Sequence, residues 1–218
     1  MGYLFAVFVG YLLGSSNMAF YLSKLKNIDL KKRGSGNLGT CNAWTELGWK
    51  WSVLVFLHDA GKAAIAVLLT AWLFPDYAYS QHVAGVCAVL GHIYPFYLKF
   101  KGGKGHAAYI GMGFALNWWV ALIVTPLCLL ALLITDYISA LIFATIIFFP
   151  LALFCFGEWQ AGLIVLIATA FVAYYQKENI ARIKNGTESK FLAAFLGKNK
   201  NKDKKDESAT PDDENKED

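Results

Sequence analysis

The chain has 218 residues, of which 56% are apolar, and it carries 20 Lys and Arg against 16 Asp and Glu. Soluble domains seldom exceed about half apolar residues, so the composition argues against a soluble protein and favours a membrane protein. The net charge of +4 is uneven: residues 1–197 hold 14 basic and 8 acidic side chains, whereas residues 198–218 hold 6 and 8. The second segment has too few apolar residues to bury a core. We therefore predict a membrane domain over 1–197 and a disordered, charged cytoplasmic tail over 198–218.

The membrane domain is predicted to be all helical, because its apolar residues form runs long enough to approach the width of a bilayer. A bilayer core needs about 20 mostly apolar residues per helix. The runs cover residues 3–22, 51–74, 82–98, 107–117, 118–135, 137–156 and 158–175. The fourth run is short for a full crossing, and residues 107–135 alternatively form one long tilted helix. The chain then has either seven spans or six.

The basic residues of the loops distinguish these two topologies. They follow the first, third and seventh runs, as Lys24, Lys26, Lys31, Lys32, Arg33 and Lys50, then Lys99, Lys101 and Lys104, then Lys177, Arg182, Lys184 and Lys190. The linkers at 75–81, around residue 117 and at 157–158 contain no Lys or Arg. Only seven spans place all of these cations on one side, as the positive-inside rule requires. We predict seven transmembrane helices, with the N-terminus outside and the C-terminus in the cytoplasm.

The second and third runs contain ionisable residues that are costly inside a bilayer. Asp59 and Lys62 are three positions apart and so share a helix face. A central charge costs about 3 kcal/mol on insertion scales, so it usually has a partner or a task. The pair is either a structural ion pair that locks helix packing, or a pair that reaches a polar cavity open to the cytoplasm. His92 is either a proton carrier or a satisfied core histidine, and Pro95 should kink or end its helix.

Two loops are rich in glycine. The first glycine loop, residues 34–40, has the sequence GSGNLGT, and the second glycine loop, residues 101–106, has the sequence KGGKGH. Glycine lets successive backbone N–H groups converge on one point, which can bind an anion. A helix that begins near Gly105 would add the positive end of its dipole, and Lys104 would add a full charge. The alternative is a pair of flexible tight turns with surface lysines.

A third polar segment follows the seventh run and contains Glu178, Asn179, Arg182, Gly186 and Glu188. This segment, the two glycine loops and the end of the third run all fall at the cytoplasmic ends of the predicted spans. Together they offer several cations, glycine amides and amide side chains. Such a set suits a phosphate-bearing ligand that meets a substrate from the lipid phase.

Four stretches occur in order along the chain: IDLKKRGSGNLGTCNAW, the Asp59-x-x-Lys62 pair, GHIYPFYLKFKGGKG and ENIARIKNGTE. From about Leu13 to Glu188 the sequence resembles the bacterial acyl-phosphate-dependent glycerol-3-phosphate acyltransferases, the PlsY family. The resemblance implies an enzyme of phospholipid biosynthesis that moves a fatty acyl group from acyl phosphate to the 1-hydroxyl of glycerol 3-phosphate, giving lysophosphatidic acid and phosphate. It implies seven spans, no coenzyme A, no metal and no nucleic-acid partner. It also implies a multi-pass protein of the bacterial plasma membrane whose active site faces the cytoplasm.

The resemblance and the polar residues described above together give the candidate site residues. The candidates for catalysis are Ser35, Lys104 and Asn179. The candidates for substrate binding are Gly36, Asn37, Gly39, Asn42, Asp59, Lys62, His92, Gly102, Gly103, Gly105, Arg182, Gly186 and Glu188. In this reading Lys104 and the glycine amides hold phosphate, while Ser35 and Asn179 orient the acceptor.

The sequence departs from the usual family motifs at two positions of the site. Thr45 stands where an arginine is usual, and Gln176 stands where a histidine is usual. Threonine cannot make the bidentate, always-charged contact of an arginine, and glutamine keeps hydrogen bonding but loses proton transfer. Lys177 and Arg33 are candidates to supply the missing charge. Two alternatives therefore stay open: a paralogue of the same fold with a different substrate, and a non-catalytic lipid-binding or transport protein.

Overall fold

The structure, a computed structural model, describes residues 1–188 and 190–192, and within these ranges the regular structure is helical throughout. The helices are α1 (Gly2–Ser15), α2 (Met18–Leu25), α3 (Thr40–Leu47), α4 (Trp49–Leu73), α5 (Ser80–Ile93), the 3₁₀ turn η1 (Phe96–Leu98), α6 (His106–Leu116), α7 (Trp118–Thr135), α8 (Ile138–Cys155), α9 (Trp159–Tyr174) and α10 (Lys177–Lys184). The prediction of an all-helical fold is confirmed for this part of the chain. The tail predicted at 198–218 lies outside the described residues.

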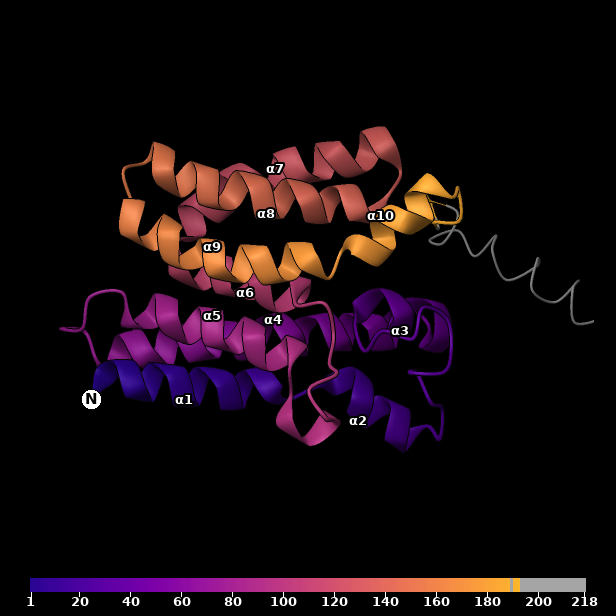
Figure 1. Ribbon diagram of the computed structural model, residues 1–218, viewed down its shortest axis with the longest axis horizontal. Coiled ribbons are helices and arrows are strands. Elements are labelled where there is room, and N and C mark those ends of the chain that lie inside the picture. Colours follow the sequence, from indigo (N-terminus) through magenta and orange to yellow (C-terminus); the bar gives the residue numbers. More distant parts are fainter. Residues whose placement is uncertain (189, 193–218) are drawn as a thin grey trace, which may run out of the picture.

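The long helices form a layered bundle. Helices α1, α4, α5, α6, α7, α8 and α9 lie side by side along the long axis of the molecule (Figure 1). α7 packs on α8 at one side, α1, α4 and α5 pack together at the other, and α6 and α9 lie between these two groups. The N-terminus lies at one end of the bundle, and the short helices α2, α3 and α10 lie at the opposite end.

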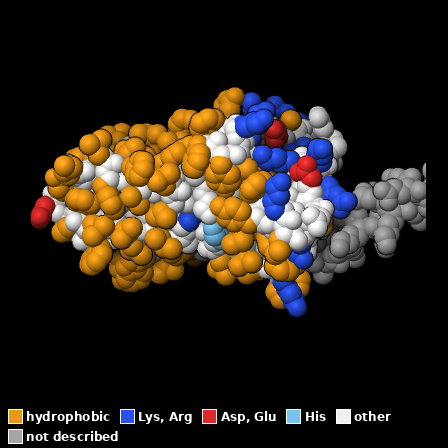
Figure 2. Space-filling view, turned by 90° about the horizontal axis from the view of Figure 1, so that it is seen from below, with side chains coloured by type: hydrophobic (Ala, Val, Ile, Leu, Met, Phe, Trp, Pro, Cys, Tyr) orange, Lys and Arg blue, Asp and Glu red, His pale blue; other side chains and the backbone are white. Residues whose placement is uncertain are grey.

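The surface of the bundle is divided into an apolar part and a basic end. Hydrophobic side chains cover most of its length, and Lys and Arg gather at the end that carries α2, α3 and α10 (Figure 2). Large apolar side chains face outward, among them Leu133 at 76% exposure, Ile134 at 74% and Leu163 at 60%. A continuous apolar surface of this extent marks a membrane-embedded protein rather than a water-soluble one.

The lengths of the helices also indicate a membrane protein. Among the described residues, four segments are long and apolar enough to cross a membrane: Gly2–Leu25, Trp49–Leu73, Trp118–Thr135 and Ile138–Cys155. The bent pair Trp159–Tyr174 and Lys177–Lys184 makes a fifth if it counts as one span. α5 and α6 have 14 and 11 residues, which is shorter than the roughly 20 residues of a full crossing.

The ambiguous stretch 107–135 is two helices rather than one. The break falls at Asn117, whose Oδ1 accepts a hydrogen bond from the N–H of Val120 at 3.1 Å and so caps α7. Its Nδ2 donates to Glu158 Oε1 at 2.8 Å, which ties the α6–α7 break to the start of α9. An asparagine at a helix N-cap satisfies N–H groups that the helix leaves open. The short fourth run is therefore a separate helix, as the charge pattern predicted.

The first run is interrupted where the sequence suggested continuity. α1 ends at Ser15, and Asn17 caps α2 by accepting a hydrogen bond from the N–H of Phe20 at 2.8 Å. The helix end predicted at Pro95 is confirmed, because α5 ends at Ile93. Both breaks lie at the basic end of the bundle, where they leave backbone groups free to bond outside their helices.

Small residues bring α1 close to α5. A Cβ atom on Gly14 would lie 2.1 Å from the carbonyl oxygen of Ala88, and one on Gly10 would lie 2.3 Å from that of Ala84. Small residues at such positions are typical of helix pairs in membranes, because they let the two backbones approach. This contact fixes α1, and hence the α1–α2 break, against the helix that leads to the second glycine loop.

Candidate active site

A dense group of polar contacts joins the second glycine loop to α10. Lys104 Nζ donates to Asn179 Oδ1 at 2.5 Å and lies 3.1 Å from Glu178 Oε2. The side chain of Lys104 is 14% exposed, whereas that of Glu178 is 62% exposed. Glu178 is thus a solvent-accessible partner that an incoming anion can replace, while Asn179 is a buried one.

Arg182 and Glu188 complete this group together with Ser139. Arg182 donates from Nη2 to Asn179 Oδ1 and from Nε to Glu188 Oε2, both at 2.6 Å. Ser139 Oγ donates to Glu188 Oε1 at 2.6 Å and accepts from Asn179 Nδ2 at 3.2 Å. We call Lys104, Ser139, Asn179, Arg182 and Glu188 the Lys104 network. Within it, the single oxygen Asn179 Oδ1 accepts from two cations.

Sequence reasoning found every member of the Lys104 network except Ser139. This serine lies in the first turn of α8, at the basic end of the bundle. A hydroxyl near the start of an apolar run was the available signal, but it is weak because isolated serines are common in membrane helices.

The backbone beyond α9 brings Glu188 back to Arg182. The axes of α9 and α10 differ by 44°. After α10, Gly186 has φ +68, a left-handed conformation that favours glycine. The N–H groups of Thr187 and Glu188 then donate to the carbonyl of Arg182 at 2.9 and 3.2 Å. Gly186 therefore acts through this turn, and no contact in the described residues gives it a binding role of its own.

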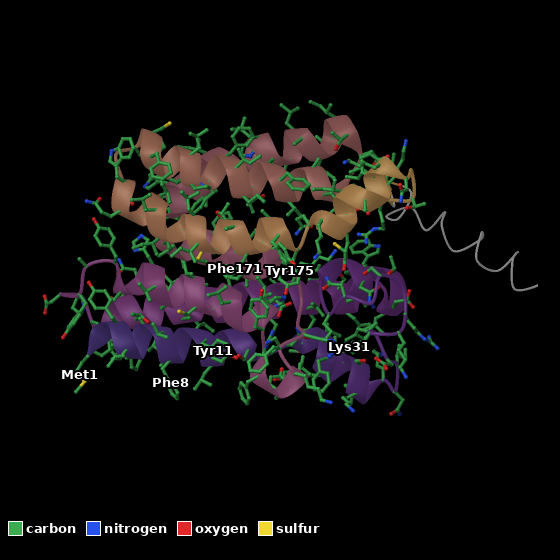
Figure 3. All side chains as sticks on the ribbon, in the orientation of Figure 1. Met1, Phe8, Tyr11, Lys31, Phe171 and Tyr175 are labelled. Atoms are coloured by element: carbon green, nitrogen blue, oxygen red, sulfur yellow. The ribbon has the colours of Figure 1, made fainter. Side chains whose placement is uncertain are left out.

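Aromatic contacts hold the end of α9 against the end of α5. The ring of Tyr94 lies 6.0 Å from that of Phe171 and 5.8 Å from that of Tyr175. Phe171 and Tyr175 lie on the side of α9 that faces the α1–α4–α5 group (Figure 3). From α1, the hydroxyl of Tyr11 donates to the carbonyl of Tyr94 at 2.8 Å. These contacts fix α10 relative to the second glycine loop.

The second glycine loop differs from the predicted anion-binding nest. The N–H of Gly102 donates to the carbonyl of Ile93 at 2.9 Å, and that of Gly103 donates to the carbonyl of His92 at 3.2 Å. Both amides are therefore occupied, and the expectation that they hold phosphate is wrong for this structure. Gly105 has φ +85 and caps α6, so the prediction that a helix begins near Gly105, beside Lys104, is confirmed.

The first glycine loop is organised by Asn42. Its Oδ1 accepts from the N–H of Ser35 at 2.9 Å, and its Nδ2 donates to the carbonyls of Leu30 at 3.0 Å and Arg33 at 3.2 Å. The polar atoms of Asn42 are thus used within the loop and the segment that precedes it. Ser35 is exposed, Gly36 and Asn37 are partly buried, and Gly39 is buried. In the described residues, no hydrogen bond joins the Ser35 hydroxyl to the Lys104 network.

The first glycine loop nevertheless lies near the network. The Cys41 thiol, in the first turn of α3, is within electrostatic range of Lys104, Arg182 and Glu188. A Cβ atom on Gly103 would lie 2.8 Å from the carbonyl oxygen of Leu38, so the two glycine loops are packed against each other. The two glycine loops and the polar segment after α9 therefore meet at one end of the bundle, as the sequence predicted.

The ionisable residues of α4 pair with one another and with His92. Lys62 Nζ lies 3.1 Å from Asp59 Oδ1 and 2.8 Å from His92 Nδ1. Exposure is 0% for Asp59, 6% for Lys62 and 2% for His92. Of the two interpretations left open by the sequence, the internal ion pair agrees with this geometry. These three side chains are shielded almost completely from solvent.

Several buried polar atoms near the network lack a partner. Thr40 Oγ1, His106 Nε2 and both amide atoms of Gln176 are buried without a hydrogen bond. They come from the starts of α3 and α6 and from the junction of α9 and α10. Buried polar groups are usually paired, so unpaired ones at a site are candidates to bind a polar ligand. Gln176, in particular, is fully buried and has no titratable group.

The two candidate replacements for the missing charges do not reach the network. Lys177 Nζ lies 3.1 Å from the hydroxyl of Tyr174 and 4.3 Å from the centre of its ring. Arg33 is exposed, and so is Thr45, whose hydroxyl donates to the carbonyl of Asn42 at 3.1 Å. Among residues 1–188 and 190–192, no group of three His, Cys, Asp or Glu side chains could hold a metal ion.

An apolar cavity of about 240 Å³ lies between α4, α6, α7 and α8. Its lining includes Tyr109 from the first turn of α6 and Leu141, which follows Ser139 by two residues on α8. From Leu141 to Phe149 the lining extends about 12 Å along α8, at 1.5 Å per residue. Phe114 and Leu129 also line it and are 40% and 47% exposed, so the cavity reaches the apolar surface of the bundle. The lining is almost entirely apolar, which suits a hydrocarbon chain.

Comparison of sequences identifies the relatives of the chain. The model of a family described as glycerol-3-phosphate acyltransferase matches residues 4–186. The chain is 36% identical over 202 residues to the glycerol-3-phosphate acyltransferase of Thermosipho melanesiensis, a match that covers 92% of this chain and 99% of the relative. It is 39% identical over 190 residues to that of Aquifex aeolicus, a match that covers 86% and 98% of the two chains.

Solved structures agree with this assignment. The crystal structure of PlsY, an integral membrane glycerol 3-phosphate acyltransferase, in its glycerol 3-phosphate form has a TM-score of 0.84 and 35% identity, covering 90% of this chain and 98% of that one. Its lysophosphatidic acid form has a TM-score of 0.81 and 34% identity, covering 90% and 100%. The chain therefore belongs to the glycerol-3-phosphate acyltransferase family of integral membrane proteins, which includes PlsY.

Proposed function

We propose that this chain transfers a fatty acyl group from acyl phosphate to the 1-hydroxyl of glycerol 3-phosphate, giving lysophosphatidic acid and phosphate. The observation that carries the proposal is the Lys104 network, which gathers two cations at the basic end of a bundle that also contains an apolar cavity. Lys104 and Arg182 supply two positive charges, and both point at one amide oxygen, Asn179 Oδ1. The relatives named glycerol-3-phosphate acyltransferase support the acceptor.

The chemistry needs little more than positioning and charge. In acyl phosphate the acyl carbonyl is already activated as a mixed anhydride, so no covalent enzyme intermediate is required. The acceptor oxygen bonds to the carbonyl carbon, the carbon–oxygen bond to phosphate breaks, and the hydroxyl proton ends on the departing phosphate. Lys104 and Arg182 would hold phosphate groups and stabilise the developing negative charge. Ser35 and Asn179 would orient the acceptor, and Gln176 would offer its unpaired amide to a substrate oxygen.

The acyl chain is proposed to lie in the apolar cavity. Burying each CH₂ group of a chain stabilises binding by about 0.8 kcal/mol, so the depth of the cavity should set the preferred chain length. Cys128 lines the cavity and is 4% exposed. A larger side chain at this position would shorten the space available to the chain.

We expect Cys128→Phe to shift the preferred acyl phosphate toward shorter chains while leaving the KM for glycerol 3-phosphate nearly unchanged. The readout is kcat/KM for a series of acyl phosphates of increasing length. Leu133→Phe is the matched control, because Leu133 is on the same helix, is 76% exposed and does not line the cavity. An unaltered chain-length profile in Cys128→Phe would place the acyl chain elsewhere.

The topology proposed from the sequence fits this function. Seven crossings, with the N-terminus outside and the C-terminus inside, would put the basic end and the Lys104 network at the cytoplasmic face of a bacterial plasma membrane. The placement of the N-terminus and α10 at opposite ends of the bundle supports an odd number of crossings (Figure 1). The segment 198–218 would then be a charged cytoplasmic tail, and the soluble substrate would arrive from the cytoplasm while the acyl donor arrives from the bilayer.

The direct test is acyl transfer by the purified protein, with palmitoyl phosphate and radiolabelled glycerol 3-phosphate. Lysophosphatidic acid formed by the unmutated protein, and not by a Lys104→Ala variant, is the expected result. Failure of folded protein to form product would favour a paralogue with another substrate, with Thr45 and Gln176 as the residues to change first.

Thr45→Arg is expected to raise activity or to leave it intact. Thr45 is exposed in α3, near the first glycine loop, so a longer cationic side chain has room there. An arginine would add a charged, bidentate contact for phosphate. The measurement is kcat/KM for glycerol 3-phosphate in the variant and in the unmutated protein. A collapse of activity would mean that this surface is built for a different ligand.

A further inference from the structure

A cluster of ionisable side chains lies inside the bundle, around one ammonium group. Lys62 Nζ donates to Asp59 Oδ1 at 3.1 Å, to His92 Nδ1 at 2.8 Å and to the carbonyl oxygen of Ser16 at 2.5 Å. His58 Nδ1 lies 3.1 Å from the same oxygen of Asp59, and His58 Nε2 lies 2.9 Å from Ser16 Oγ. We call these five residues the Lys62 cluster. It joins α4 to the α1–α2 break and to the last turn of α5.

The geometry leaves Lys62 no donor for a substrate. An ammonium group has three N–H donors, and all three have acceptors within the cluster. The side chains of Lys62 and Asp59 are 5% and 0% exposed. Direct binding of a phosphate by this lysine would break at least one of these contacts inside an apolar region, where an unpaired charge is costly.

One set of contacts runs from Lys62 to the first glycine loop. The carbonyl of Ser16 is free of helical bonding because the chain breaks between α1 and α2, and Lys62 satisfies it. The next residue, Asn17, is fully buried and donates from Nδ2 to the carbonyl of Leu38 at 3.2 Å. Lys62 thereby fixes the segment that holds the middle of the first glycine loop.

A second set of contacts runs from Lys62 to the second glycine loop. His92 accepts from Lys62 at Nδ1, so a neutral ring carries its proton on Nε2. A Cβ atom on Gly103 would lie 2.2 Å from His92 Nε2, which shows how closely the ring packs on the loop. The carbonyl of His92 also accepts from the N–H of Gly103 at 3.2 Å. Lys104 follows directly in the chain.

We propose that Lys62 is a positioning residue that sets the two glycine loops relative to each other, through Ser16 and Asn17 on one side and His92 and Gly103 on the other. The inference rests on the proposed function, because its consequence is the placement of Lys104 against the substrates. A displacement of about 1 Å in a reacting group can lower a rate by about 100-fold, so a remote lysine can control turnover without touching substrate.

The test separates positioning from simple stability. Lys62→Met alone would leave the Asp59 carboxylate buried without its ammonium partner and would destabilise the fold. The informative variant is therefore Asp59→Asn/Lys62→Met, which removes both charges. It is compared with Asp59→Asn, which keeps the donors of Lys62 on Ser16 and His92 but leaves the buried ammonium without its carboxylate, so thermal unfolding is measured for both variants beside their activity. Thr70→Val is the control on the same helix, because the Thr70 hydroxyl is buried and donates to the carbonyl of Ala66 within its own helix.

We expect the double variant to be about 100-fold lower in kcat than Asp59→Asn, with a thermal unfolding temperature no lower than that of Asp59→Asn, because it leaves no unpaired buried charge. The KM for glycerol 3-phosphate should change much less than kcat, since no binding group is removed. A double variant that is as active as Asp59→Asn would overturn the proposal and leave the cluster a purely stabilising role. A rise in KM with unchanged kcat would also overturn it, because it would mean that Lys62 contacts substrate.

A second readout does not depend on catalysis. Cys41, at the end of the first glycine loop, and Cys155, at the end of α8, are both exposed free cysteines. The rate of thiol labelling at Cys41 should change in the double variant and not in Thr70→Val, while labelling at Cys155 stays constant as an internal reference. Unchanged labelling of Cys41 would overturn the proposal. This readout also applies if the unmutated protein proves inactive on the substrates proposed above, so the two failures are distinguishable.

Discussion

Replacing Lys104 with alanine is expected to lower acyl transfer by about 10³-fold, because it removes the positive charge that we propose holds the reacting phosphate. Lys104 is mostly buried, and its ammonium bridges the second glycine loop to α10 through Asn179. Substitution would therefore lose both the charge and the contact that fixes it. The measurement is kcat/KM with palmitoyl phosphate and glycerol 3-phosphate, on protein whose thermal unfolding matches that of the unmutated chain.

Lys101→Ala is the matched control for Lys104→Ala. Lys101 lies three residues earlier in the same loop, and its side chain is exposed. Its removal lowers the net charge by the same amount and should change activity less than about threefold, since exposed charges contribute little. Equal losses in the two variants would mean that the loop acts through general electrostatic attraction. Undiminished turnover in Lys104→Ala would remove this lysine from the mechanism.

Replacing Asn179 with alanine is expected to lower kcat by about 10²-fold. Asn179 Oδ1 accepts from both Lys104 and Arg182, and its Nδ2 donates to Ser139. Without this amide the two cations lose the shared acceptor that holds them close together against their mutual repulsion. The defect should appear in kcat and kcat/KM together, as for an interaction needed in the transition state.

Asn185→Ala provides the comparison for Asn179→Ala. Asn185 ends the same helix, is exposed, and makes its helix-ending contacts through the backbone. Its replacement should leave both kinetic constants close to those of the unmutated protein. If instead Asn179→Ala raised only the KM for glycerol 3-phosphate, Asn179 would bind the acceptor equally in the ground state and the transition state. It would then not act by organising the two cations.

The sequence predicted the parts of the fold that depend on local chemistry. Pro95 cannot continue a helix, and α5 ends before it. Asn117 marks the break between α6 and α7, where the charge pattern required one. The helix break at Asn17 was not predicted from the sequence. A single asparagine in an apolar run does not by itself end a helix; here its side chain caps α2 and also donates a hydrogen bond to the carbonyl of Leu38. That second contact depends on tertiary structure and leaves no local pattern.

In the candidate site, too, residues within distinctive local motifs were predicted, and contacts that depend on tertiary structure were not. Lys104, Asn179, Arg182 and Glu188 were predicted as members and do meet, because each belongs to a motif with unusual polar content for a membrane protein. The predicted use of the Gly102 and Gly103 amides was wrong, since the end of α5 supplies carbonyls that occupy them. Ser139 was missed because a lone serine in an apolar run gains its meaning only from its neighbours in space.

The position of the apolar cavity has a consequence for the product. Phe114 and Leu129 line the cavity and are 40% and 47% exposed, so it reaches the lipid-facing surface of the bundle. A product with one acyl chain can then diffuse sideways into the adjacent leaflet, with its hydrocarbon never crossing water. Its headgroup would stay at the basic end of the bundle throughout, so under the proposed function the product enters the leaflet that borders this end.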